Sequence, residues 1–279
     1  MFPGQGSQYR RMGEKLFPLF PEYCKLADFL LGYSIEELCL EDANRNINKT
    51  SFTQSAVFFV SCLTYLHAIQ TGIKKPDLLL GHSLGLFSAL FAAGVFDLET
   101  GLNIVITRGQ LMESASDGAM LAVIGQGVEE LPELLIQHQI TEIDIANLNT
   151  PTQAVLSGKK KPIQDIQRIL EVENFKCIPL FVSGPFHSRY MDSVREKFTQ
   201  FLMGISLNKP SIPIISTTNA EVLSEHFLYE EMSFQLIKPV RWSHTIKGLL
   251  TKYPSIQFKE IGPGNVLEGL NRQIIQTVI

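Results

Sequence analysis

Short apolar runs alternate along the chain with longer segments of helical spacing, a pattern typical of an α/β protein. One apolar run, Leu78–Leu80, predicts a buried strand, and the small and apolar residues of 85–94 predict a closely packed helix. Gly81-His82-Ser83-Leu84-Gly85 lies between them. Gly-x-Ser-x-Gly between a strand and a helix is typical of a nucleophile elbow, a tight turn that exposes the serine hydroxyl.

The same five-residue pattern also occurs by chance in loops, so its context decides the interpretation. Here an apolar run precedes the turn and a small-residue helix follows it, as an elbow requires. The predicted turn places Ser83 at a helix N-terminus, where free backbone N–H groups and the helix dipole favour a developing negative charge. We therefore predict that Ser83 is a nucleophile.

Helical spacing dominates the segments on either side of the elbow. Residues 12–40 are expected to be helical with interruptions at two prolines, and the polar stretch 50–55 is expected to cap an apolar helix. A further helix is predicted over 101–114 and carries Arg108. Near the C-terminal end, 212–216 and 256–261 are predicted strands, which extends the α/β pattern to most of the chain.

A different order of elements begins near residue 118. The predicted sequence is strand, helix, strand, strand, helix, strand, which is the ferredoxin-like pattern. An inserted small subdomain follows from it. The six predicted elements are 119–125, 128–139, 143–147, 154–158, 161–172 and 177–182.

Composition narrows the class of protein. The 279 residues are 45% hydrophobic and 19% charged, as in an ordinary globular enzyme, and the net charge of −4 argues against nucleic-acid binding. We expect neither a membrane span nor an export signal, because no uninterrupted apolar run reaches about 18 residues. The four cysteines are far apart and are expected to be reduced, in a cytoplasmic protein. Almost no strand precedes the first glycine-rich turn, which leaves open whether residues precede Met1 in the natural chain.

A serine nucleophile needs a base within hydrogen-bonding reach and N–H donors for the oxyanion. Among the six histidines, His187 is the candidate base because it lies on a glycine-proline turn after a predicted strand. His82 adjoins the serine but projects the other way along the turn, which favours a structural role. No His, Asp or Glu cluster has the spacing of metal ligands, so no metal is expected.

Six ordered motifs, which together extend over nearly the whole chain, give it a specific resemblance. The chain resembles the malonyl-CoA:acyl-carrier-protein transacylases, and is most similar to the free-standing acyltransferases that serve polyketide synthases lacking their own acyltransferase domain. The motifs are Phe2–Gln8, Gly81–Gly85, Thr107–Met112, Asn147–Pro151, Gly184–Ser188 and Gln235–Trp242.

The resemblance implies an α/β fold: a hydrolase-like core with a mainly parallel sheet and the nucleophile elbow, plus the inserted ferredoxin-like subdomain. We expect the core to comprise 1–118 and 187–279 and the small subdomain to comprise 119–186. Malonyl-CoA is then the substrate, the phosphopantetheine thiol of an acyl-carrier protein is the acceptor, and no bound cofactor is required. Membranes and nucleic acids are not expected partners.

The resemblance also implies roles for individual residues. Ser83 would be acylated with His187 as the base, and the backbone N–H groups of Gln5 and Leu84 would form the oxyanion hole. The backbone carbonyl of Gln235 would orient the histidine in place of a carboxylate. The resemblance therefore implies no acidic third member, and nothing near Asp97, Asp117, Asp144 or Asp165 recommends one.

Two further residues bear on the acyl group. Arg108 would bind the free carboxylate of malonate, although an arginine paired with Glu99 or Glu113 is the alternative. Phe186 would limit the size of the acyl group and favour malonyl over methylmalonyl.

Other features leave the function partly open. Leu86 replaces a charged residue that many members of the family carry, and we expect it near the pocket mouth. An acyl-carrier-protein hydrolase that edits stalled chains, with the same serine and histidine, is therefore the alternative function. Lys159–Lys161 is expected to be a solvated basic surface, with docking of an acidic partner as the other interpretation. Thr217 also departs from the family pattern, away from the chemistry.

Overall fold

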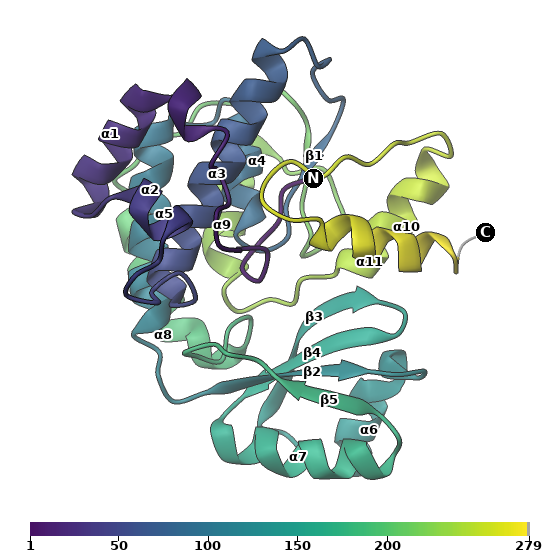
Figure 1. Ribbon diagram of the computed structural model, residues 1–279. Coiled ribbons are helices and arrows are strands. Elements are labelled where there is room, and N and C mark those ends of the chain that lie inside the picture. The colour runs from purple at the N-terminus through teal and green to yellow at the C-terminus, as the bar shows by residue number, and fades with distance from the viewer. Residues whose placement is uncertain (278–279) are drawn as a thin grey trace.

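The computed structural model describes residues 1–277 and shows two units, a larger helical one around a short parallel sheet and a smaller one around an antiparallel sheet (Figure 1). The strands are β1 (Leu79–Leu80), β2 (Ala119–Ile124), β3 (Ile143–Thr150), β4 (Gln153–Gly158), β5 (Lys176–Pro179) and β6 (Ile214–Ile215). The α-helices are α1 (Pro21–Leu31), α2 (Ile35–Leu40), α3 (Thr50–Gln70), α4 (Gly85–Ala92), α5 (Leu98–Glu113), α6 (Leu131–Gln137), α7 (Lys160–Val172), α8 (Asp192–Leu202), α9 (Leu228–Phe234), α10 (Trp242–Lys252) and α11 (Val266–Ile275).

The strand that leads into the elbow is short and has neighbours on both sides. β1 pairs in parallel with β6, and Phe2 makes an isolated parallel bridge to Gly81 on the other side. The strand predicted at 256–261 is wrong. Within this segment the Ile256 N–H donates to the nearby Tyr253 carbonyl, and only the N–H of Ile261 and the carbonyl of Lys259 bond to a distant residue, Met1. No regular ladder forms over 256–261.

Helix α3 forms the centre of the larger unit and packs against α4 and α5. It contains no charged residue, and within the described residues it is the one helix long and apolar enough to cross a membrane by length and composition. However, 67% of its most apolar window is buried inside the protein. We therefore interpret α3 as a core helix.

The predicted cap at 50–55 is wrong, because α3 already begins at Thr50. No side chain of the preceding residue caps the helix. Instead the Glu113 carboxylate, at the end of α5, accepts from the Ser51 N–H at 3.2 Å. A cap donated from another helix cannot be recognised from the residues next to the helix start.

The smaller unit has the predicted ferredoxin-like arrangement. Its strands lie in the order β3-β4-β2-β5, every neighbouring pair is antiparallel, and α6 and α7 cover one face (Figure 1). The unit buries its own hydrophobic cluster between sheet and helices. Several bounds differ from expectation, and three differ by more than one residue: the first helix is a 3-10 turn followed by α6, β3 continues to Thr150, and the last strand ends at Pro179.

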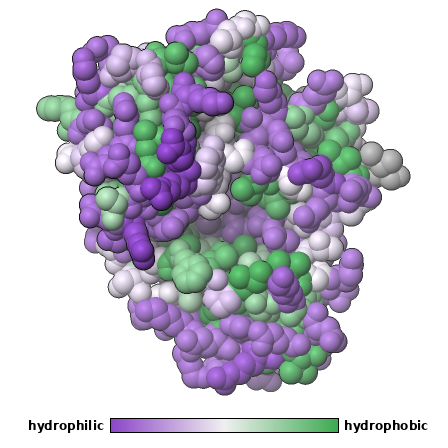
Figure 2. Space-filling view, viewed as in Figure 1, coloured by the Kyte–Doolittle hydropathy of each residue, from purple (hydrophilic) through white to green (hydrophobic). Residues whose placement is uncertain are grey.

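The edge strand β3 joins the two units. Its Asn147 bridges in parallel to Val240, in the loop before α10, and α10 and α11 lie above it (Figure 1). Figure 2 shows a hollow on this face between the larger unit and the small sheet, with apolar side chains along its lower rim.

Candidate active site

The turn at Ser83 has the geometry of a nucleophile elbow. Ser83 lies in the left-handed region with φ of +50°, which is strained for a residue with a side chain. A Cβ on Gly81 would lie 2.0 Å from the backbone of Gly85, and a Cβ on Gly85 would lie 2.1 Å from the Phe2 carbonyl oxygen. Only glycine fits either position, which explains the pattern that predicts the turn.

The first glycine-rich turn lies directly against the elbow. Phe2 donates to the Leu80 carbonyl at 2.9 Å and accepts from the His82 N–H at 3.0 Å. A Cβ on Gly4 would lie 2.4 Å from the His82 oxygen, so the two backbones touch. Within residues 1–277 the N–H groups of Gln5 and Leu84 donate to no protein acceptor. The predicted oxyanion donors are therefore both available for a ligand.

Ser83 and His187 lie within hydrogen-bonding distance, with 2.8 Å between Oγ and Nε2. The imidazole Nδ1 lies 2.6 Å from the Gln235 carbonyl oxygen and 3.2 Å from that of Lys238. Because a carbonyl can only accept, Nδ1 carries the proton and Nε2 is free to accept one from Ser83. The orienting group is thus a backbone carbonyl, as the resemblance implies.

Burial keeps this histidine neutral. His187 is 5% exposed, and desolvation lowers its pKa to about 3, helped by the positive charge of Arg108. The hydrogen bonds to the two carbonyls act in the opposite direction but are the smaller effect. At neutral pH the imidazole is therefore in the form that can act as a base.

Arg108 is a buried cation without a carboxylate partner in the described chain. It is 1% exposed, and its guanidinium donates to the side-chain oxygens of Gln54 at 2.6 Å and Gln235 at 2.9 Å. Its Nη2 also lies 3.4 Å from Ser83 Oγ, and its Nε has no partner. Pairing with Glu113 is ruled out, because that carboxylate caps α3.

Burial lowers the pKa of Arg108 to about 9, which leaves the group charged at neutral pH. The guanidinium also lies over the Phe87 ring, 5.2 Å from the centroid. Burying a charged group away from water costs free energy unless the negative charge of a ligand pairs with it. The arrangement can therefore bind an acyl group that ends in a carboxylate, next to the serine.

Two residues that hold Arg108 were missed by sequence analysis. Gln54 was assigned to a cap, although a glutamine on an otherwise apolar helix is a signal for a buried polar contact. Gln235 was expected to contribute only its carbonyl, but its side chain also accepts from the guanidinium. One residue thus contacts both the base and the arginine.

Phe186 is 4% exposed and belongs to the main hydrophobic cluster, next to His187 in sequence. Leu86 is 4% exposed and belongs to the same cluster. His82 is partly buried, and its Nε2 lies 2.9 Å from the Oδ1 of Asn149 on β3. His138, His226 and His244 are exposed.

Lys159 pairs with Glu142 and Lys161 pairs with Asp165 on the surface of the small unit. In the part of the chain that the structure describes, no three His, Cys, Asp or Glu side chains are grouped to hold a metal ion. All four cysteines are free thiols.

A serine on an elbow, paired with a neutral histidine and two free N–H donors, defines an acyl-transferring enzyme that works through an acyl-serine. The comparison with protein families agrees: residues 1–272 match the acyl transferase domain model. The chain belongs to the acyl transferase domain family.

Individual relatives are similar over almost the whole length. The chain is 45% identical over 276 residues to the polyketide biosynthesis malonyl CoA-acyl carrier protein transacylase PksC of Bacillus subtilis, covering 98% of this chain and 96% of the relative. It is 39% identical to a malonyl CoA-acyl carrier protein transacylase crystal structure from Burkholderia pseudomallei, with a TM-score of 0.95 and coverage of 99% and 97%. A second similar structure holds a malonyl-transacylase in complex with a type II polyketide synthase acyl-carrier protein, at 32% identity, a TM-score of 0.92 and coverage of 99% and 92%.

Proposed function

We propose that this protein transfers a malonyl group from coenzyme A to the pantetheine thiol of an acyl-carrier protein. The buried guanidinium of Arg108, 3.4 Å from Ser83 Oγ and without a carboxylate partner in residues 1–277, is the observation that carries the choice of malonyl. A planar fork of N–H donors matches a carboxylate, so the acyl group on Ser83 should end in one.

The first half-reaction acylates the serine. Ser83 Oγ attacks the thioester carbonyl while His187 Nε2 takes its proton, and the N–H groups of Gln5 and Leu84 stabilise the oxyanion, each by about 3 kcal/mol. The carbon–sulfur bond then breaks. The leaving thiolate of coenzyme A receives the proton from His187, which restores the neutral imidazole.

The second half-reaction runs the same steps with a different thiol. The pantetheine thiol of the carrier protein gives its proton to His187 and attacks the acyl-serine carbonyl. Collapse of the tetrahedral intermediate breaks the bond to Ser83 Oγ, which recovers its proton from His187. No bound cofactor is required, because the protein supplies the nucleophile, the base and the oxyanion donors.

The cellular setting follows from the relatives. We assign the protein to polyketide biosynthesis, since PksC and BaeC are named polyketide biosynthesis malonyl CoA-acyl carrier protein transacylases. We further propose that it acts in trans on carrier proteins in the cytoplasm. We also take 119–186 as the small subdomain, because this range contains the complete four-stranded sheet with its two helices.

Intact-mass measurement tests the function directly. The protein is incubated with malonyl-CoA and then with a phosphopantetheinylated carrier protein, with Ser83→Ala as the matched control. We expect one malonyl adduct on the wild-type enzyme, its transfer to the carrier, and neither with Ser83→Ala. Release of free acid from a carrier loaded with a longer acyl group, without malonyl transfer, would instead support the editing hydrolase.

A further inference from the structure

We infer that Asp144 and Arg189 form a positioning pair that holds the turn carrying His187 at its distance from Ser83. Asp144 is on β3 of the small sheet, whereas Arg189 follows the base by two residues. The inference rests on the proposed role of His187 as the base, and it assigns to the small unit a part in placing that base.

The turn that carries the base is strained and needs external support. His187 has φ of +57°, in the left-handed region that residues with a side chain rarely adopt. Ser188 Oγ closes the turn locally by donating to the Pro185 carbonyl. A conformation of this kind persists only where surrounding contacts determine it.

Arg189 supplies such contacts through both its backbone and its side chain. Its backbone N–H donates to Asp144 Oδ2 at 2.8 Å, and its Nε lies 3.0 Å from each carboxylate oxygen, with Nη2 also donating to Oδ1. One carboxylate therefore accepts from the main chain and from the guanidinium of the same residue. The backbone bond fixes the chain itself, two residues from the imidazole.

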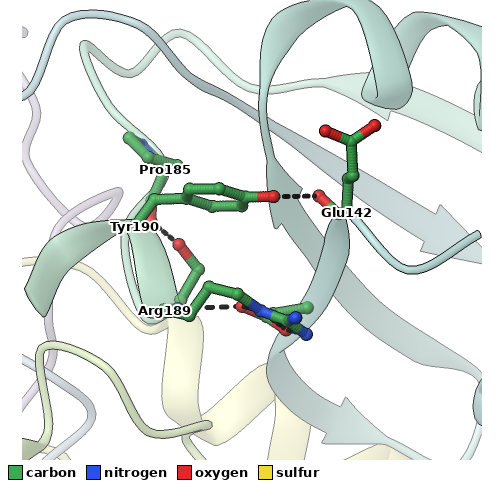
Figure 3. A network of polar contacts seen from close by, with 6 residues as sticks. Glu142, Pro185, Arg189 and Tyr190 are labelled. Atoms are coloured by element: carbon green, nitrogen blue, oxygen red, sulfur yellow. Dashed lines mark hydrogen bonds and ion pairs between the residues drawn. The ribbon is translucent and has the colours of Figure 1, made fainter.

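A second contact lies beside the first. The Tyr190 hydroxyl donates to the backbone carbonyl of Glu142 at 3.1 Å, directly before β3 (Figure 3). The Lys159 ammonium lies 5.8 Å from the centre of the Tyr190 ring and 3.6 Å from the Glu142 carboxylate. The chain after His187 is thus fastened to the small unit at two successive residues.

The same strand also holds the loop that orients the imidazole. Leu148 N–H donates to the Val240 carbonyl at 2.9 Å, and Val240 N–H donates to the Ala146 carbonyl at 2.8 Å. Val240 lies two residues after Lys238, whose backbone carbonyl is one of the two that accept a hydrogen bond from His187 Nδ1. β3 is therefore a common support for the base and for an acceptor that orients it.

Packing alone does not immobilise this side of the turn. An open groove of about 620 Å³ lies here, lined by His187, Arg189 and Asp144 together with apolar residues of α6 and of the 237–239 loop. Without the carboxylate, the turn can move toward this groove and its water. Such a movement lengthens the contact between Ser83 and His187 and exposes the imidazole, which raises its pKa toward the ordinary value.

The backbone bond predicts a graded series of variants. Asp144→Ala removes the acceptor for both donors, and we expect kcat for malonyl transfer to fall roughly tenfold with KM for malonyl-CoA unchanged, since small displacements of a catalytic group are costly. Asp144→Asn keeps an oxygen for the Arg189 N–H and should lose less than about threefold. Arg189→Ala keeps the backbone bond and should behave like Asp144→Asn, because a partly exposed ion pair contributes little.

Rates are measured per active site, by counting malonyl adducts on Ser83 over pH 4–9, and Asp165→Ala serves as the control. Asp165 pairs with Lys161 on the same unit, away from the turn, so its loss should change neither kcat nor the pH profile. We expect Asp144→Ala alone to shift the acid limb of kcat to higher pH. An unchanged kcat and acid limb in Asp144→Ala, or a loss explained entirely by fewer active sites, would overturn the inference. Failure of the wild-type enzyme to malonylate Ser83 would overturn the proposed function instead.

Discussion

Removing the Arg108 guanidinium should separate substrates by their carboxylate. In Arg108→Ala the pocket loses its only charged group near Ser83 Oγ within the described residues, while the base and both oxyanion donors remain. Malonyl-CoA and acetyl-CoA differ by the carboxylate, so the variant should affect them unequally.

The magnitude follows from the donors that remain available. Gln54 and Gln235 occupy two of the N–H groups, Nε has no partner, and the contact from Nη2 to Ser83 is long at 3.4 Å. Two charge-assisted bonds to a carboxylate contribute about 1.5–3 kcal/mol each. The lower end, about 3 kcal/mol in total, corresponds to a loss of roughly a hundredfold in kcat/KM for malonyl.

The assay measures kcat/KM for both thioesters with one carrier protein at pH 8. This pH is chosen because Arg108 lowers the pKa of His187, so its removal raises that pKa. At pH 8 the base stays neutral even at an ordinary histidine pKa of about 6.5. We expect acetyl transfer to change by less than about threefold.

Equal losses for malonyl and acetyl would refute the reasoning and make Arg108 a structural residue. Arg108→Lys provides a second variant in case alanine disturbs folding. It retains the charge without the planar fork, and its malonyl activity should lie between those of the wild type and Arg108→Ala.

Three further predictions concern the elbow, the base and the acyl pocket. Gly85→Ala should destabilise the fold by several kcal/mol in thermal unfolding, because the added Cβ would lie 2.1 Å from the Phe2 carbonyl oxygen. The control Gly248→Ala, in open space on α10, should be neutral or stabilising by up to about 1 kcal/mol, and equal effects of the two variants would contradict this prediction. Folding lowers the pKa of His187 to about 3, so the unfolded chain binds more protons between about pH 3 and 6.5, and the free energy of unfolding falls as the pH drops through that window. His187→Gln should therefore reduce the slope of the free energy of unfolding against pH, measured by urea unfolding, by about 1 kcal/mol per pH unit. An unchanged slope would count against a neutral buried base. Phe186→Leu should raise methylmalonyl relative to malonyl turnover, and an unchanged ratio would show that the ring does not limit the acyl group.

Elements that depend mainly on neighbouring residues could be predicted from the sequence alone. The elbow is predictable because Gly81 is required within the turn itself, where a Cβ would strike the backbone of Gly85. The requirement for glycine at Gly85 is tertiary, because a Cβ there would strike the Phe2 carbonyl. The ferredoxin-like unit is predictable because its strands and helices follow one another along the chain with clear periodicity. The resemblance to acyltransferases depended on such local motifs, and the family comparison confirms it.

The tertiary structure decided which side chains support the reacting groups. Arg108 is held by glutamines 54 and 127 residues away, and the turn of His187 is held by Asp144, which sequence analysis dismissed as a third catalytic member. None of these contacts can be predicted from the residues adjacent in sequence. They exist because β3 and the ends of α3 and α9 converge on one site, and the free energy of a buried polar contact depends on that convergence rather than on local sequence.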